Sequence, residues 1–327
     1  MSTEQKRSKQ KIKPNSSLVY DKSFKLSYLK PSYFGVWLAM LFLWALAFFP
    51  AFVVDGLANL LGDIFRNVNK KRRRIARINI DLCFPELSNE EKKQLIRNNF
   101  RHQARSVLYY GLIWWAPKFI LKKRIVFKGQ EHIENSLKNN RSVIFMAAHS
   151  LGLEAAVSAA TMAYPSSGPF NPMKNKLVDW LVVKGRSRHG GILYKRDAGL
   201  RPIIKDVRGG CTMFYLPDED LGADRSIFAP FFNVEKASVP VLGRLAKSCK
   251  ADVLPCMACY DVKTHRYIIH ILPALQNFPS GDDYEDTLAM NKVLEEVIRL
   301  CPSQYFWTMK LFKTRPDGSE KLYLNLE

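Results

Sequence analysis

The chain has 327 residues and carries 50 lysines and arginines against 30 aspartates and glutamates, a formal net charge of +20. Hydrophobic residues make up 47% of it, which supports a sizeable core and excludes global disorder, while 17 glycines and 17 prolines exclude collagen-like or low-complexity structure. Six cysteines are too few for a disulfide scaffold and are predicted to be reduced thiols in a protein that faces the cytosol. The positive charge predicts anionic partners: nucleic acid, anionic lipid or an acidic protein.

The N-terminal part of the chain divides into two predicted segments. The first 30 residues are polar and basic and predict a disordered arm. No charged residue occurs from Tyr33 to Val54, and a helix of that length can cross a bilayer core. We therefore expect a basic arm over 1–32, a membrane anchor segment over 33–65 and one catalytic domain over 66–327.

The topology of the anchor segment has more than one interpretation. Pro50 lies within the apolar run, where proline kinks or breaks a helix. Both flanks are basic, with the cluster KKRRR from Lys70 to Arg74 after the run, so the positive-inside rule gives conflicting indications. An N-terminal membrane-spanning helix is the preferred interpretation, and a broken interfacial segment or a buried core helix are the alternatives. The basic cluster suits anionic lipid headgroups.

The remaining sequence alternates between helical and extended patterns. Residues 86–115 have helical periodicity, with Ser88 as the expected N-cap. Further helices are predicted at 152–163, 177–188, 199–209, 239–249 and 286–301. Strands are predicted at 142–148, 191–195, 211–216, 252–260 and 266–272, the last two as a possible hairpin. This alternation predicts an α/β fold with a largely parallel central sheet flanked by helices.

Several common motifs are absent from the sequence. It has no GxxxxGK[ST] loop, no GxGxxG after a strand and no HExxH, so nothing predicts a nucleotide cofactor or a metal. Cys256 and Cys259 form a CxxC, but residues three apart in a strand face opposite sides, which favours two core cysteines. No RNP-type or helix-turn-helix pattern supports the alternative of a membrane-anchored nucleic-acid-binding protein.

Active sites of parallel sheets gather at the carboxyl ends of the strands, where His149 follows a predicted buried strand. Glu154 comes five positions later, about 140° round an ideal helix. The two side chains can meet if His149 lies in the turn before the helix. A carboxylate on one imidazole nitrogen leaves the other free to act as a general base on an alcohol, although a structural histidine is an equally good interpretation of this pair alone.

The same heptad supports a different enzyme. AHSLG (148–152) resembles a variant nucleophile elbow, in which Ser150 would be the nucleophile of a serine hydrolase or lipase. The triad order would be completed by Asp218 or Asp220 and by His265 or His270. No HGGG-type oxyanion motif precedes it.

Four stretches together resemble a known family. They are 72–92 (RRRIARINIDLCFPELSNEEK), the pair His149 and Glu154, 214–234 (FYLPDEDLGADRSIFAPFFNV) and 302–318 (PSQYFWTMKLFKTRPDG). With the apolar segment at the front, they resemble the lysophospholipid-acyltransferase superfamily, and within it the late lipid A acyltransferases. The resemblance covers nearly the whole chain after about residue 25. Its two C-terminal stretches are long and specific, and Asp218 and Asp220 stand where the family has its PD-x-D-x-G element.

The resemblance implies an O-acyltransferase without a cofactor or a metal. Such enzymes move a fatty acyl group from acyl carrier protein to a hydroxyl of a 3-hydroxyacyl chain on a lipid A precursor, at the cytoplasmic face of the inner membrane. His149 would be the general base and Glu154 would orient it. Another lipid acceptor, such as a lysophospholipid, is an alternative. The acyl chain needs an apolar tunnel, for which Trp180 and Phe231 are candidates alongside a core role.

The resemblance also suggests substrate-binding residues. Arg196 aligns with a basic residue that helps to hold phosphate or headgroup, but it could equally pair with Asp218 or Asp220. These two aspartates could position substrate hydroxyls or brace Arg196. Lys313 and Arg315 could bind lipid A phosphates, a task that suits arginine, or be surface cations.

Overall fold

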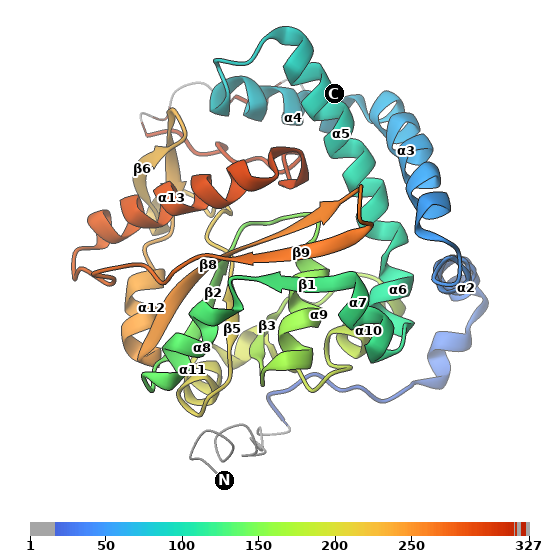
Figure 1. Ribbon diagram of the computed structural model, residues 1–327, viewed down its shortest axis with the longest axis horizontal. Helices are drawn as coiled ribbons and strands as arrows, with labels where there is room; N and C mark the ends of the chain where they lie inside the picture. The colour runs from blue at the N-terminus through green and yellow to red at the C-terminus, as the bar shows by residue number, and fades with distance from the viewer. Residues whose placement is uncertain (1–16, 317, 319–321, 325–327) are drawn as a thin grey trace.

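A five-stranded sheet forms the centre of the molecule and has helices on both faces (Figure 1). The computed structural model describes residues 17–316, 318 and 322–324. The sheet order is β1 (Ile125–Lys128), β9 (Arg266–Ile271), β8 (Ala251–Asp261), β2 (Ser142–Ala147) and β5 (Met213–Tyr215). β8 and β9 form an antiparallel hairpin, and the other neighbouring strands are parallel. The predicted largely parallel α/β sheet is confirmed.

The predicted helices of the body form close to their expected positions. They are α9 (Leu153–Ala163), α10 (Lys176–Arg186), α11 (Arg201–Arg208), α12 (Leu242–Cys249) and α13 (Asp283–Leu300), with α8 (Gln130–Lys138) in addition. Each has an apolar face buried in the core, as its helical periodicity predicts.

Two small sheets lie outside the central one. The predicted strand at 191–195 forms as β4 (Ile192–Lys195), but it pairs with β3 (Ser167–Phe170) and does not join the central sheet. β6 (Ile227–Phe231) and β7 (Val234–Ser238) form an antiparallel hairpin that packs against α13. The sequence patterns did not predict β1, β3 or this hairpin.

The apolar run near the N-terminus is broken at Pro50. α2 (Phe34–Leu46) ends before this proline and α3 (Ala51–Val68) begins after it, with Pro50 at its N-cap because proline lacks the amide hydrogen that would continue α2. Within the described residues, no helix combines the length and the hydropathy that a bilayer crossing needs. The predicted membrane-spanning helix is therefore not confirmed.

Helices α4 (Lys70–Cys83) and α5 (Asn89–Leu108) follow, then α6 (Tyr110–Trp115) and α7 (Lys118–Arg124). The expected N-cap of α5 is confirmed, since Ser88 and Glu91 form a capping box. α3 is fixed to the body by the buried carboxylate of Asp55. This group accepts from Arg105 Nε at 2.7 Å and Tyr260 Oη at 2.8 Å, and contacts His265 Nδ1 at 2.6 Å.

Part of the expected N-terminal arm is ordered. Tyr20 N donates to Leu193 O at 3.1 Å and Lys195 N donates to Leu18 O at 3.0 Å, so residues 18–20 add to the edge of β4. Tyr28 is buried, with its ring 5.7 Å from that of Trp180. The contacts of residues 18–20 and the burial of Tyr28 contradict the predicted disorder at those positions, although Leu26 and Leu29 are exposed. Residues 1–16 lie outside the described part of the chain.

Candidate active site

His149 lies in the short turn between β2 and α9. Two backbone bonds hold this turn from the C-terminal part of the chain: Leu151 N donates to Gln304 O at 2.8 Å, and Phe306 N donates to His149 O at 2.9 Å. Gly152 ends the turn, where a Cβ atom would lie 2.7 Å from Ala258 O. Only glycine lets the start of α9 approach β8 this closely.

Asp218 is the carboxylate that holds His149. Its Oδ1 lies 2.6 Å from His149 Nδ1, and its Oδ2 accepts from the His149 backbone N–H at 2.8 Å. The two residues, which form a His149–Asp218 dyad, meet because β2 and β5 are parallel neighbours. Met146 of β2 pairs with Tyr215 of β5, and His149 and Asp218 each come three residues after these paired positions. Asp218 is fully buried, whereas 26% of the His149 side chain is exposed. An ionised Asp218 fixes the Nδ1–H tautomer and leaves Nε2 as a proton acceptor.

The charges of this dyad stabilise each other. Burial opposes a proton on His149, but the Asp218 carboxylate outweighs it and raises the pKa of His149 above its ordinary value. Burial alone would raise the pKa of Asp218, yet the contacts with His149 hold this pKa below its ordinary value. Glu219 lies farther away, with Oε1 3.9 Å from His149 Nε2.

Glu154 has a different partner from the one expected. Its carboxylate pairs with the guanidinium of Arg186, whose Nε donates to Glu154 Oε1 at 2.8 Å. The expectation that Glu154 orients the imidazole is corrected, because Asp218 occupies that position. Glu154 is the second residue of α9, and Arg186 at the end of α10 supplies its cation. Arg186 also lies over the ring of Phe170, 5.5 Å from its centroid.

A cavity of about 520 Å³ opens beside His149. Most of its wall is apolar, and the ionisable groups among the described residues that line it are His149, Arg186, Glu219 and the phenol of Tyr215. The apolar wall includes Leu153, Val157, Phe170, Leu193, Met213 and Phe214. Trp180 and Phe231 are buried in the core and do not line this cavity.

The other predicted site residues are dispersed. Asp220 accepts from Thr314 N at 2.6 Å and Thr314 Oγ1 at 2.7 Å, so it anchors the C-terminal segment. Arg196 is exposed after β4 and does not pair with Asp218 or Asp220, whose oxygens have these other partners. Lys313 is exposed, and Arg315 Nη1 donates to Glu235 O at 3.2 Å.

The hydrolase triad is not assembled. Ser150 is buried and its backbone forms a bridge with Tyr305. Asp218 is bound to His149, and His265 contacts Asp55. His270 lies within β9, paired with Lys128 and Met257.

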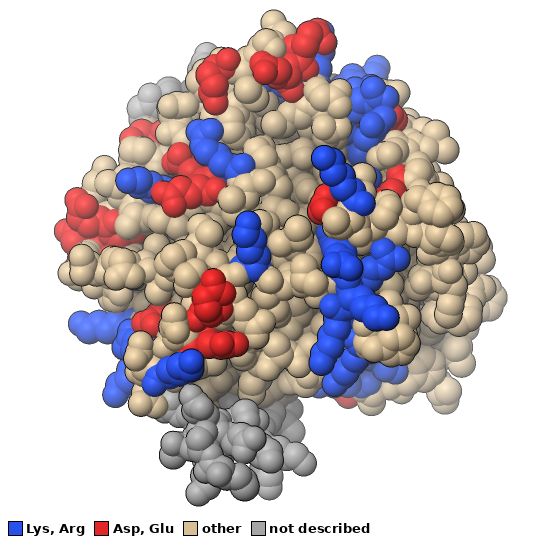
Figure 2. Space-filling view, in the orientation of Figure 1, with Lys and Arg blue, Asp and Glu red and all other residues tan. Residues whose placement is uncertain are grey.

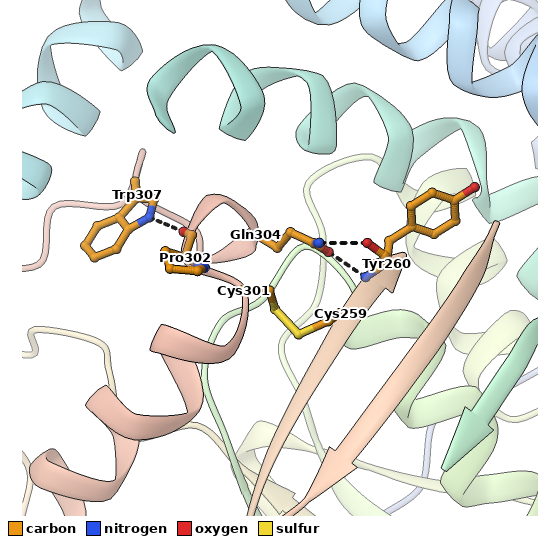
Figure 3. Close-up of a disulfide and its surroundings, with 6 residues drawn as sticks. All are labelled: Cys259, Tyr260, Cys301, Pro302, Gln304 and Trp307. Atoms are coloured by element: carbon orange, nitrogen blue, oxygen red, sulfur yellow. Dashed lines mark hydrogen bonds between the residues drawn. A yellow bond between two sulfur atoms is a disulfide. The ribbon is translucent and has the colours of Figure 1, made fainter. Parts of the chain in front are cut away.

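A disulfide lies close to the turn of His149. Cys259 and Cys301 are bonded, which corrects the prediction that all six cysteines are reduced thiols, while Cys83, Cys211, Cys249 and Cys256 are free and buried. Figure 3 shows this bond beside Gln304, whose side chain accepts from Tyr260 N at 2.7 Å and donates to Tyr260 O at 2.9 Å. The segment that holds His149 is therefore itself fixed to β8. Cys256 faces the other side of β8, as the CxxC spacing predicts.

Two residues near the site escaped the sequence interpretation. Arg186 lies within the helix predicted at 177–188 and is the last residue of α10, and only its charge marked it in the sequence. Lys236 lies in the hairpin β6–β7 and is fully buried, although its sequence context VEKAS resembles an exposed strand. In the described residues, no group of three or more His, Cys, Asp or Glu side chains is arranged to hold a metal ion.

Comparison with known proteins identifies the family to which this chain is similar. The profile of the bacterial lipid A biosynthesis acyltransferase family matches residues 21–314. A lipid A biosynthesis acyltransferase of Haemophilus influenzae is 37% identical over 96% of this chain and 98% of its own length. The lipid A biosynthesis myristoyltransferase of Escherichia coli is 33% identical over 95% of this chain and 96% of its own. The lipid A biosynthesis lauroyltransferase of Escherichia coli is also 33% identical, over 92% of this chain and 98% of its own length.

Proposed function

We propose that this chain, which belongs to the bacterial lipid A biosynthesis acyltransferase family, transfers a fatty acyl group from acyl carrier protein to a hydroxyl of a 3-hydroxyacyl chain on a lipid A precursor. The family supports acyl transfer onto lipid A. The choice of donor and acceptor hydroxyl is the proposal. It is carried by one observation: the His149–Asp218 dyad lies at the wall of a largely apolar cavity that suits an acyl chain.

In the proposed reaction, His149 Nε2 takes the proton of the acceptor hydroxyl as its oxygen attacks the carbonyl carbon of the thioester. The tetrahedral intermediate then expels the carrier thiolate, which takes the proton from the imidazolium. The products are an ester and a free thiol. Asp218 holds the imidazole through both steps. Arg186 is the cation of the cavity wall and is our candidate to stabilise the oxyanion, with Glu154 positioning it.

The remaining predicted binding residues have roles that fit their positions. Arg196, Lys313 and Arg315 offer cations for the phosphates of the acceptor, and the first two are exposed. Asp220 acts on the substrate site through Thr314, which lies between Lys313 and Arg315. The carboxylate-rich carrier protein would be attracted by the net charge of +20.

We further propose that the protein lies on the cytoplasmic face of the inner membrane through α2 and α3. Large apolar side chains are exposed along both helices, including Phe34, Leu38, Leu41, Phe52, Leu60, Ile64 and Val68. Figure 2 shows this uncharged surface around α2 beside lysine and arginine side chains gathered over α7. A hollow of about 400 Å³ next to α3 is lined by Arg66, Lys70, Arg73, Arg74, Arg77, Lys93 and Ile96. An apolar face bordered by cations is typical of helices that lie in an anionic membrane surface.

Binding to vesicles tests the membrane proposal. Sedimentation with phosphatidylglycerol-containing vesicles should exceed that with phosphatidylcholine vesicles, and the variant Phe34→Ser/Leu38→Ser should sediment less with both. Equal sedimentation of the variant and the native chain would contradict this mode of attachment.

Mass spectrometry tests the reaction. A lipid A precursor is incubated with the detergent-purified protein and a panel of acyl carrier protein thioesters, for the native chain, His149→Ala and Ser150→Ala. A mass gain of one or more acyl groups that is lost in His149→Ala supports the proposal and identifies the preferred donor. If a lysophospholipid were acylated and the lipid A precursor were not, the acceptor would be the lysophospholipid. Free fatty acid without a modified acceptor, lost in Ser150→Ala, would indicate a hydrolase.

A further inference from the structure

The cavity of about 520 Å³ beside His149, here called the acyl cavity, extends along α9 and β5. Leu153, Val157 and Thr161 line one side of it. They are spaced four residues apart on one face of α9 and cover about 12 Å of that helix. Residues 213–216 of β5 and the segment after it line another side. Because α9 begins just after His149 and β5 ends just before Asp218, both elements lead from the dyad to the far end of the cavity.

A second cavity, of about 390 Å³, is lined by the same three segments that form this far end. At the end of α9, in the loop before β3 and at the start of β5, one residue lines the acyl cavity and a residue one or two positions away lines the second cavity. These pairs, with the acyl-cavity residue first, are Thr161 and Ala163, Ser166 and Pro165, and Met213 and Thr212. The two cavities are therefore separated by a thin wall.

Two paired hydroxyl side chains form this wall. Ser166 Oγ lies 2.9 Å from Thr212 Oγ1, and the two residues form a parallel β-bridge. The backbone holds them in place, since Thr212 N donates to Pro165 O at 2.7 Å and Ser167 N donates to Thr212 O at 2.9 Å. Both side chains are buried, and threonine has little rotamer freedom because it is branched at Cβ. The hydroxyls satisfy each other, so they can end an apolar cavity without an unpaired polar group.

An acyl chain in the acyl cavity, with its carbonyl carbon near His149, has its methyl end toward this wall. A longer chain would need space that closely packed, hydrogen-bonded side chains do not yield. We propose that the Ser166–Thr212 pair determines donor specificity by setting the longest acyl chain that the enzyme transfers. Beyond the pair, Leu137 and Ala163 give the second cavity apolar surface, so opening the wall should admit a longer chain.

The test is a competition between acyl carrier protein thioesters of stepwise longer saturated chains, with the full chain in detergent and mass spectrometry of the acylated acceptor. The ratio of kcat/KM for two competing donors does not depend on how much of the protein is folded. Ser166→Ala/Thr212→Ala removes both hydroxyls and the threonine methyl. In this variant, kcat/KM for the next longer donor, relative to the donor that the native chain prefers, should rise by about tenfold.

Two controls separate the wall from a general loss of packing. Thr212→Val keeps the size of the side chain and loses its hydroxyl, so the filled wall should keep the native donor ratio. Thr287→Ala truncates an equally buried threonine of α13 that lines neither cavity. It should lower the melting temperature and leave the donor ratio at the native value.

An unchanged donor ratio in the double variant overturns the inference, and so does a shift of the same size in Thr287→Ala. If the double variant shows no cooperative thermal transition, Thr212→Ala alone is judged by the same ratio. The inference rests on the proposed function, but the two fail differently. Absence of transfer by the native chain from any donor rejects the function, whereas native transfer with an unchanged ratio in the opened variant rejects only the role of the wall.

Discussion

Asp218 binds His149 at two atoms at once, with one carboxylate oxygen on the ring Nδ1 and the other on the backbone N–H of the same residue. The double contact sets both the tautomer and the position of the imidazole. It also joins the ends of two neighbouring parallel strands, β2 and β5, so the dyad depends on the register of the central sheet.

Asp218→Asn should lower kcat by about 10²–10⁴-fold while the protein stays folded. The amide can still accept from the backbone N–H, but its NH₂ group would favour the wrong imidazole tautomer. Acyl transfer rates and thermal unfolding of Asp218→Asn and His149→Ala would be compared. A kcat within a few-fold of the native value would show that Asp218 does not hold the base.

The acidic limb of the native pH–rate profile should have its midpoint above about 6.5, the ordinary pKa of histidine. The pKa of His149 is raised, and the base works only when it is unprotonated, so activity falls as the pH drops through that pKa. Any residual activity of Asp218→Asn should show a limb at lower pH than in the native chain. A native midpoint below that ordinary value would contradict the assignment of His149.

Glu154→Gln should lower both stability and kcat without moving the acidic limb. It leaves Arg186 without its carboxylate. Because the Arg186 side chain is 25% exposed, we expect the free energy of unfolding to fall by about 2–3 kcal/mol. Thermal unfolding and pH profiles would be recorded together. Asp63→Asn is the control, since it breaks a similar pair with Arg97 and Arg101 away from the cavity and should lower stability alone. A limb shifted downward in Glu154→Gln would restore Glu154 as the residue that acts on the imidazole.

Gly152→Ala should destabilise the protein by about 1–3 kcal/mol and reduce kcat, because the added methyl would meet Ala258 O at 2.7 Å and displace the start of α9 with the turn of His149. Gly56→Ala is the matched control, since a Cβ there meets nothing within 4 Å. Calorimetry and acyl transfer rates would separate the two variants. Identical behaviour of both would show that the close approach is not needed.

Cys301→Ser should lower the free energy of unfolding by about 2–4 kcal/mol, since the disulfide closes a loop with a sequence separation of 42. The segment that follows Cys301 holds the turn of His149, so kcat should fall as well. Melting temperatures would be measured with and without dithiothreitol. The reductant should lower the native value and leave Cys301→Ser unchanged, and mass spectrometry of non-reduced peptides would check the Cys259–Cys301 bond directly.

Local features of the chain were predictable from its sequence. The helix periodicities, the N-cap at Ser88, the extended pattern of β2 and the turn that carries His149 depend on interactions between residues a few positions apart. The break of the apolar run at Pro50 belongs to this class too, because proline acts on its own backbone. The residues that resemble the family also lie in continuous stretches, so family membership could be inferred before the fold.

The partners of these residues were decided only in three dimensions. Glu154 is close to His149 in sequence, yet Asp218, 69 residues away, holds the imidazole because β5 lies beside β2 in parallel register. The bond between Cys259 and Cys301, the contact of His265 with Asp55 and the burial of Lys236 depend in the same way on which elements become neighbours. Sequence patterns report the preferences of a segment for a conformation and for burial. The pairing of groups far apart in the chain is set by how the sheet and its covering helices pack, and that packing is where the site is assembled.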